Sequence, residues 1–334
     1  MNPKYNPLFT PYALNNGVEI KNRLTVAPLT IYDSGEDGEM TEAGRRFWQN
    51  RFEGFGLYIM PFTNVHPSGI GFESPNAFDE RHLPTLREYA EIAHAQGAKA
   101  VVQIAHSGSR AERSMTQGHD VIAPTGDLYG RFRTMTEQEV WEMVESFAYA
   151  AELVMKAGFD GIEIHGANGW LIQQFMSAAT NLRTDYWGGN LEKRMSFPLA
   201  IVDKIDEMRK NITALISSLA TVSRLKNRGR RHYDERNPRI SGRIVGKTVA
   251  ISAHFIMGFL QKVRRGRIPT LPVCKWYTAV SMDECRSLPR AISTPQTICL
   301  MPTKQAGWKA FQSVKHYAQP ESRGTDPNWA RSRN

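Results

Sequence analysis

Four apolar segments, each followed by a segment with helical spacing, constrain the fold of this chain more than any other feature of its sequence. The apolar segments span residues 22–30, 56–65, 98–106 and 161–164. The helical segments span residues 41–51, 83–96, 137–157 and 191–210. Repeated alternation of strands and helices is typical of a parallel sheet covered by helices, either open or closed into a barrel. The sequence therefore predicts an α/β fold.

The third helical segment carries the clearest local signals. Thr136 and Glu139 have the spacing of a capping box, in which each side chain accepts a hydrogen bond from the other residue's backbone N–H. Behind them, helical spacing gathers apolar residues on one face: Val140, Val144, Phe147, Ala151 and Val154. Gly158 follows this segment and Gly97 follows the one before it, as is typical at helix C-termini. We expect both helices to pack against the sheet.

The alternation stops after about residue 211, and the charge changes at the same place. Residues 1–211 hold 20 Lys and Arg against 27 Asp and Glu, whereas residues 212–334 hold 22 against 6. The net charge of +9 therefore describes neither part. The three cysteines, Cys274, Cys285 and Cys299, fall in the second part at spacings of 11 and 14 residues. Their number and spacing predict neither a disulfide framework nor an iron–sulfur cluster.

Polar residues follow the predicted strands at places where α/β barrels carry out chemistry. His165 and Asn168 come directly after the apolar segment 161–164, and a long loop of residues 107–135 follows the third strand. Loops at the carboxyl ends of barrel strands form active sites, and loops of this length in a compact domain are commonly functional. From the residues alone, a histidine after a strand is more often structural than catalytic, so the role of His165 stays open here.

A longer motif lies downstream of this pair. Residues 180–194 read Thr-Asn-Leu-Arg-Thr-Asp-Tyr-Trp-Gly-Gly-Asn-Leu-Glu-Lys-Arg. Together with His165 and Asn168, this run resembles the old yellow enzyme family of FMN-dependent NAD(P)H oxidoreductases. The resemblance covers about residues 7–210. It implies a TIM (β/α)8 barrel, of which only the first four βα units are recognisable, with FMN at the carboxyl ends of the strands and NADH or NADPH as reductant.

The resemblance assigns three residues to the cofactor. Pro28 and Thr30 match the segment under the flavin, where Thr30 would donate a hydrogen bond near flavin O4 and N5 and so tune the redox potential. Gln103 matches a glutamine that contacts the pyrimidine edge of FMN, which suits a side chain with both a donor and an acceptor. Without the resemblance, Thr30 is interpreted as a β-branched strand residue and Gln103 as an amide at a strand end.

The same resemblance implies that His165 and Asn168 hold the carbonyl or other electron-withdrawing oxygen of the substrate. Two donors there stabilise the charge that develops when hydride reaches the β-carbon. Tyr32 and Trp170 match substrate-binding positions, and no metal site is expected. Many family members have a proton-donating tyrosine where Trp170 stands, but an indole N–H is a very poor acid. Either water or another group protonates the substrate, or the acceptor, such as O₂ or a quinone-like molecule, needs no such proton.

The phosphate-binding half of the barrel is not recognisable after residue 211. We interpret residues 1–211 as the N-terminal half of an FMN-binding barrel, and residues 212–334 as a basic, disordered segment that a reading-frame shift near codon 211 produces. Residues 325–330 resemble a family segment, which predicts that the frame is restored near residue 324. Four βα units do not close a barrel, so the fourth strand would lie at an open edge, where apolar strands aggregate.

The alternative is a non-catalytic barrel fragment whose basic tail binds nucleic acid or a membrane. Such a tail should contain an ordered basic framework, and the arginine clusters at residues 228–232 and 264–267 lack one. We therefore expect a small-molecule substrate and no nucleic-acid partner, with a homo-oligomer left open. The sequence has no run of eighteen apolar residues, and its first residues lack the apolar core of a signal peptide. We expect a cytoplasmic protein without a membrane span.

Overall fold

The computed structural model describes residues 3–14, 18–208, 216–221 and 298–300 of the 334-residue chain. The strands of its main sheet are β3 Leu24–Val26, β4 Leu57–Asn64, β5 Lys99–Ala105, β8 Gly161–Gly166, β9 Ile216–Thr221 and β10 Ile298–Leu300. Their order is β10-β3-β4-β5-β8-β9. All neighbours pair in parallel except β10, which runs antiparallel to β3. The four predicted strands therefore form a parallel sheet in chain order, as expected.

Two features of the sheet differ from the sequence-based expectations. β8 is not an edge strand, because β9 pairs with it over its whole length, from Gly161↔Ile216 to Gly166↔Thr221. The sequence does not predict β9, since Ile-Ser-Ser-Leu-Ala-Thr contains no continuous apolar run. β3 ends at Val26, four residues before the predicted end. Pro28 lies just beyond and has no N–H to offer the ladder.

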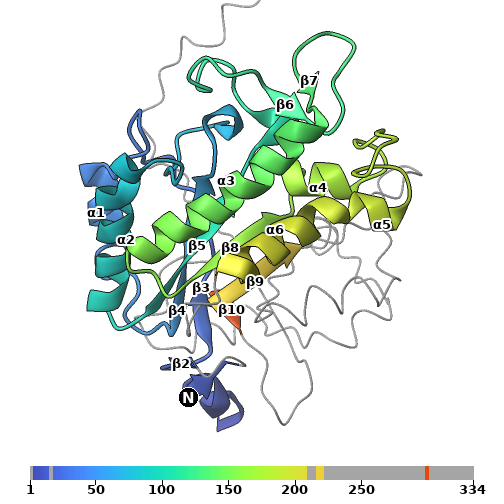
Figure 1. Cartoon of the computed structure of the whole chain (residues 1–334). Helices are drawn as coiled ribbons and strands as arrows, with labels where there is room; N and C mark the ends of the chain where they lie inside the picture. The colour runs from blue at the N-terminus through green and yellow to red at the C-terminus, as the bar shows by residue number, and fades with distance from the viewer. Residues whose placement is uncertain (1–2, 15–17, 209–215, 222–297, 301–334) are drawn as a thin grey trace, which may run out of the picture.

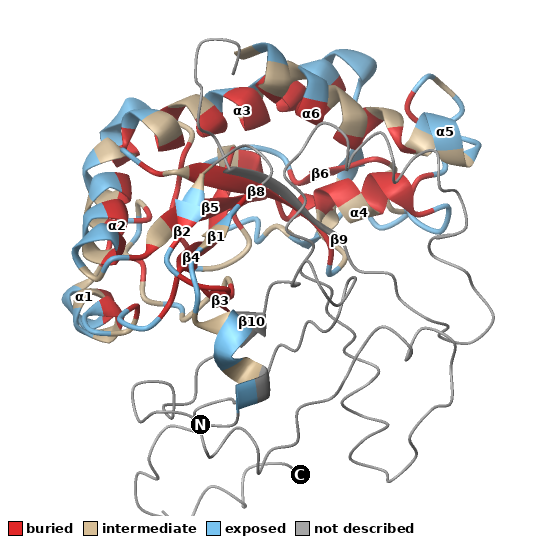
Figure 2. Cartoon of the chain, turned by 90° about the horizontal axis from the view of Figure 1, so that it is seen from below, coloured by how far each residue is buried: buried red, intermediate tan, exposed pale blue. Residues whose placement is uncertain are grey.

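Helices cover one face of this sheet (Figure 1). They are α1 Glu42–Trp48, α2 Leu83–Ala95, α3 Glu137–Lys156 and α6 Ser196–Met208. α3 contacts β5, β8 and α6, and the buried residues of α3 and α6 lie on the sides turned to the sheet (Figure 2). All five residues of the predicted apolar face of α3 are buried. The capping box also forms, because Glu139 N donates to Thr136 Oγ1 at 3.1 Å and Thr136 N donates to the Glu139 carboxylate at 2.8 Å.

The predicted helix over residues 191–210 is interrupted. α5 spans Leu191–Arg194, and α6 begins at Ser196. Pro198 explains the break, because it has no backbone N–H to donate to the carbonyl of residue 194 and its ring crowds that carbonyl. The proline is tolerated within the first turn of α6, where intrahelical N–H partners are not yet required.

The remaining elements are short and lie mostly in the loops. They are η1 Pro3–Leu8, β1 Tyr12–Ala13, β2 Glu19–Ile20, η2 Pro67–Gly69, η3 Glu80–His82, η4 Gly108–Arg110, β6 Ile122–Ala123, β7 Arg133–Thr134 and α4 Leu171–Met176. β6 and β7 pair in parallel within the 107–135 loop. Most of the 212–334 segment, which was expected to be disordered, lies outside the described residues.

Strand alternation divides the sheet residues between two faces. Val102, Ile104, Ile162 and Ile164 belong to the large core beneath the helices. Val101 belongs to a smaller apolar cluster that also includes residues of the β1–β2 hairpin. We call the sheet face that carries this second cluster the inner face. Because side chains alternate along a strand, the inner face also carries the polar residues of β5 and β8: Gln103, Glu163 and His165.

Candidate active site

The predicted site residues lie in or after the strands along one edge of the sheet. Because β3, β4, β5 and β8 are parallel, their carboxyl ends and the loops that follow form one rim. Pro28, Thr30 and Tyr32 follow β3, Gln103 lies in β5, His165 lies in β8, and Asn168 and Trp170 follow β8. Gln103 and His165 are buried, with 5% exposure each, whereas Tyr32 is 64% exposed. The rim therefore places buried polar side chains beneath more exposed loop residues.

Aromatic rings connect several of these residues. Phe62 lies 5.8 Å from His165 and 5.2 Å from Trp170 between ring centroids. Phe72 lies 5.7 Å from Tyr32 and 4.9 Å from Phe62. Tyr32, His165 and Trp170 thus belong to one aromatic cluster whose other members, Phe62 and Phe72, the sequence interpretation missed. The ladder shifts register between Met60 and Phe62, and such irregularities re-aim side chains next to active sites.

The loop after β8 turns sharply. Asn168 has φ 59° and Gly169 has φ 80°, so two successive residues adopt the left-handed region. Asparagine tolerates this region better than most residues. Arg110 fixes the turn from the neighbouring loop, because its Nη1 donates to Asn168 O at 2.7 Å and its guanidinium lies 4.0 Å from the Trp170 ring centroid. The structure therefore holds Asn168 and Trp170 through a residue that the sequence interpretation did not identify.

A buried acid lies beside Gln103. Glu163 is fully buried in β8, and Gln103 Nε2 donates to Glu163 Oε1 at 2.7 Å. The two residues are direct partners in the β5–β8 register. The signal in the sequence was a charged residue inside an otherwise apolar strand, since buried carboxylates require partners.

His106, which ends the third predicted strand, has a structural role in the described part of the chain. Gly108 N donates to its Nδ1 at 2.9 Å, so Nε2 carries the proton and donates to Ser68 Oγ at 3.0 Å. Burial lowers the pKa of His106 to about 3, with a smaller contribution from His66. The ring is therefore neutral at physiological pH. Its Nε2 ties the loop after β5 to Ser68 in the loop after β4, whereas its Nδ1 fixes the turn at Gly108.

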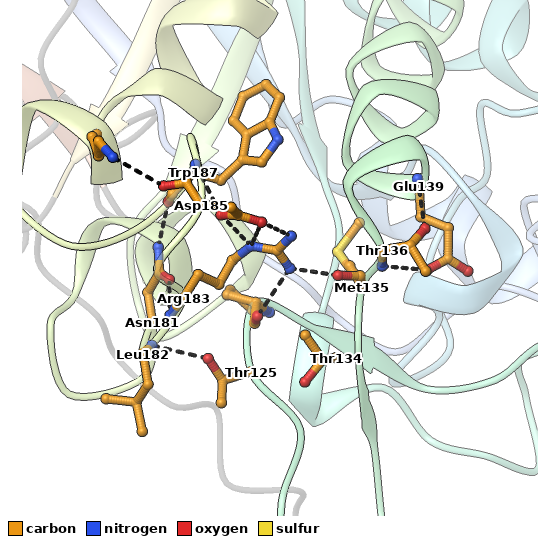
Figure 3. Close-up of polar contacts among 12 residues, drawn as sticks. Thr125, Thr134, Met135, Thr136, Glu139, Asn181, Leu182, Arg183, Asp185 and Trp187 are labelled. Carbon is orange, nitrogen blue, oxygen red and sulfur yellow. Dashed lines mark hydrogen bonds and ion pairs between the residues drawn. The ribbon is translucent and has the colours of Figure 1, made fainter.

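The 180–194 motif proves to be a clamp on the 107–135 loop (Figure 3). The buried Arg183 guanidinium donates to Pro124 O at 3.2 Å and to Met135 O at 2.5 Å. Its other edge meets both carboxylate oxygens of Asp185, with Nε 3.1 Å from each. The backbone adds a further link, because Leu182 N donates to Thr125 Oγ1 at 2.9 Å. One planar side chain thus joins two segments that lie about 50–60 residues apart.

The rest of the motif supports this clamp. Asn181 Nδ2 donates to Phe175 O and Trp187 O, each at 2.8 Å. A Cβ at Gly188 would lie 2.3 Å from Arg183 O, so this position has no room for a side chain. The motif residues named here therefore act by fixing loop structure.

Two kinds of feature are absent from the described residues. Within that part of the chain, His, Cys, Asp and Glu side chains form no cluster of three or more suited to a metal ion. None of the helices described combines the length and the apolar character that a bilayer span requires.

Comparison with known proteins identifies the family. The model of the NADH:flavin oxidoreductase / NADH oxidase family matches residues 7–227. The chain belongs to this family. It is 47% identical over 210 residues to the probable NADH-dependent flavin oxidoreductase YqiG of Bacillus subtilis, covering 61% of this chain and 56% of that relative. It is 39% identical over 204 residues to the NADPH dehydrogenase of Halalkalibacterium halodurans, covering 59% of each.

Solved structures agree on the fold. Morphinone reductase in complex with tetrahydroNAD superposes with a TM-score of 0.63 at 24% identity, covering 78% of each chain. The old yellow enzyme resemblance and the TIM-barrel fold class are therefore confirmed, with the sheet described here forming part of such a barrel. The chain spans less than two thirds of the length of the two sequence relatives named above.

Proposed function

We propose that this chain is an FMN-dependent NAD(P)H oxidoreductase of the old yellow enzyme type, in which residues 1–211 form the N-terminal half of the FMN-binding barrel. Its acceptor would be a small molecule such as an activated alkene, an enone or enoate, and nucleic acid would have no part. The observation that carries the proposal is the placement of Gln103 and His165. Both are buried on the inner face of adjacent strands, near the carboxyl ends. Family membership makes a flavin the natural occupant of that position.

The residues fit the ring system of FMN. Gln103 Nε2 donates to Glu163, whereas Gln103 Oε1 accepts no hydrogen bond from a described residue. This oxygen would therefore be left to accept a hydrogen bond from the cofactor. Thr30 is half-buried after β3, and its hydroxyl would donate a hydrogen bond near flavin O4 and N5, with Pro28 in the same cofactor-binding segment. When bound, FMN supplies the hydride that NADH or NADPH provides and that the acceptor receives. The sequence after residue 211 carries no recognisable phosphate-binding motif, so this part of the proposal concerns only the ring system of FMN.

His165 and Asn168 would act on the acceptor. His165 is held within β8, whereas Asn168 is exposed in the turn that Arg110 fixes. Donors from these two positions would hold the acceptor oxygen and stabilise its developing negative charge. Tyr32 and Trp170 belong to the aromatic cluster and would offer flat surfaces to a planar acceptor. Trp170 has no acidic hydroxyl. An alkene acceptor would therefore need its proton from water or another group, whereas an acceptor such as O₂ would not need that proton.

The test is FMN-dependent oxidation of NADH and NADPH by the purified chain, with an enone or O₂ as acceptor. We expect His165→Ala to lower enone reduction on the order of 10²-fold, as loss of an oxyanion donor does. His94→Ala is the matched control, because His94 lies on α2 and bonds Asp160. Equal rates in both variants would mean that His165 does not hold the acceptor. Absence of flavin-dependent turnover in the parent chain would refute catalysis by this chain.

The division of the chain at residue 211 is a separate part of the proposal. We propose that residues 212–323 are translated out of frame, and the abrupt change from acidic to basic composition supports this. Reading the other frames of the coding DNA over this stretch should recover four further strand–helix units with Gly-rich phosphate loops. If no frame encodes them, the basic segment is a module in its own right.

A further inference from the structure

A fully buried carboxyl group in the inner face of the sheet calls for a reason. Glu163 has 0% exposure and lies between Ile162 and Ile164, which enter the large core. Burying a carboxylate is costly unless hydrogen-bonding partners compensate. An apolar residue would serve the packing of a parallel strand better. The position of Glu163 next to Gln103 points to a role in the site.

Backbone register sets the contact between the two side chains. Gln103 and Glu163 are directly paired across β5 and β8, and both face the inner side of the sheet. The 2.7 Å hydrogen bond from Gln103 Nε2 to Glu163 Oε1 therefore needs no unusual reach by either side chain. Both residues are buried, so solvent competes little for this bond.

The bond fixes which way the glutamine amide faces. A carboxylate only accepts hydrogen bonds, whereas an amide donates from nitrogen and accepts at oxygen. Beside Glu163, the amide must turn its NH₂ group to the acid and its Oε1 away from it. The pyrimidine edge of a flavin has an N–H donor at N3 between two carbonyl acceptors. An amide in this orientation meets that donor with its oxygen, whereas a flipped amide would set donor against donor.

We infer that Glu163 is a positioning residue that sets the amide orientation of Gln103 and so presents Oε1 to flavin N3–H. The role of Oε1 towards flavin rests on the proposed function, whereas the contact between Glu163 and Gln103 does not depend on it. Glu163 itself touches neither the acceptor nor the reacting atoms. Its effect passes through Gln103.

The test uses Glu163→Gln, which keeps the shape of the side chain and removes the acceptor-only character. Asp160→Asn is the matched control. Asp160 also links β5 to β8, by accepting from Ala100 N at 2.9 Å and from Lys99 Nζ at 2.7 Å, but it lies at the opposite end of these strands. A carboxylate that only stabilises strand pairing would give the same result at both positions.

The first readout needs no cofactor. In the ¹⁵N-labelled chain, the Gln103 side-chain NH₂ signals are assigned by their loss in Gln103→Ala. We expect their hydrogen exchange to be on the order of tenfold faster in Glu163→Gln than in the parent, because a neutral amide oxygen accepts more weakly than a carboxylate and no longer fixes which way the Gln103 amide faces. Asp160→Asn should leave it unchanged. Equal exchange in the parent and Glu163→Gln, or equal acceleration in both variants, overturns the inference.

The second readout uses ¹⁵N-labelled FMN at millimolar concentration. In the parent, the N3–H signal of bound FMN should be shifted and protected from exchange, and Glu163→Gln should remove that protection while Asp160→Asn keeps it. A protected N3–H in Glu163→Gln contradicts the inference. If FMN does not bind but Gln103 exchange depends on Glu163, the positioning contact is real, and the proposed cofactor role of this chain fails on its own.

Discussion

Replacing Arg183 should release the 107–135 loop without unfolding the sheet. The guanidinium is buried, with 5% side-chain exposure, and it bonds the Asp185 carboxylate and two loop carbonyls. Removing one partner of a buried pair costs about 3–5 kcal/mol. The Asp185 side chain is 34% exposed, so water can solvate the carboxylate that remains. We therefore expect about 3 kcal/mol for Arg183→Ala.

Arg183→Lys should recover only part of this stability. An ammonium group keeps the charge, but it cannot reach the carboxylate and two carbonyls with the planar fork of the guanidinium. We expect a loss of about 2 kcal/mol, the cost of leaving buried acceptors without donors. The pH dependence of the free energy of unfolding should also change. Burial raises the pKa of Asp185, but the hydrogen bonds from Arg183 outweigh this effect and hold that pKa below its usual range.

Hydrogen exchange measures the release directly. Arg133 N donates to Val121 O and Met135 N donates to Ala123 O, so these two amides report the integrity of the loop. A loss of about 3 kcal/mol corresponds to exchange faster by on the order of 10²-fold. Arg131→Ala is the control, since Arg131 pairs within the same loop but its side chain is 70% exposed. If Arg183→Ala accelerates these amides no more than Arg131→Ala, the clamp does not hold the loop.

Trp170→Tyr adds a hydroxyl that can protonate the substrate, so alkene reduction should rise while O₂ reduction stays constant; an unchanged alkene rate would favour an acceptor that needs no proton. Gly188→Ala should cost about 1–3 kcal/mol, measured by denaturant unfolding, because its Cβ would overlap Arg183 O. Burial depresses the folded pKa of His106 to about 3, from the 6.5 of an exposed histidine. Its contribution to stability is therefore complete above pH 6.5 and declines as pH falls towards 3, and His106→Gln should flatten the pH dependence of the unfolding midpoint in that window.

Local signals in the sequence account for most of the architecture. β4, β5 and the start of β8 lie within one residue of the predicted segments, because apolar runs bounded by glycine and loop residues determine strands locally. The capping box at Thr136 is equally local. The interruption before α6 was missed although Pro198 was visible, because the apolar spacing continues across it.

Only those residues of the candidate site that follow a predicted strand or belong to the family motif could be predicted from the sequence. His165 was noted because it follows a predicted strand, but its assigned role, like that of Gln103, came from the family resemblance. Phe62 and Phe72 could not be assigned, because their contact with the site depends on a register shift in β4 and on loop packing between distant segments. Arg183 was part of a recognised motif, but its partners Pro124 and Met135 lie far away in the sequence.

Besides the contacts of Arg110 and Arg183, a buried amide joins the loops after β5 and β8. Gln174 in α4 accepts from Ser109 N at 3.0 Å and donates to Ser107 O at 3.1 Å. A Cβ at Gly108, which has φ 59°, would lie 2.2 Å from Gln174 Oε1, so the turn is built around this amide. Since Gln103 and His165 lie on the strands that these loops follow, the amide ties β5 to β8 beyond their carboxyl ends. The loop side chains thus restrict movement between β5 and β8 outside the sheet, as the Gln103–Glu163 contact does within the sheet.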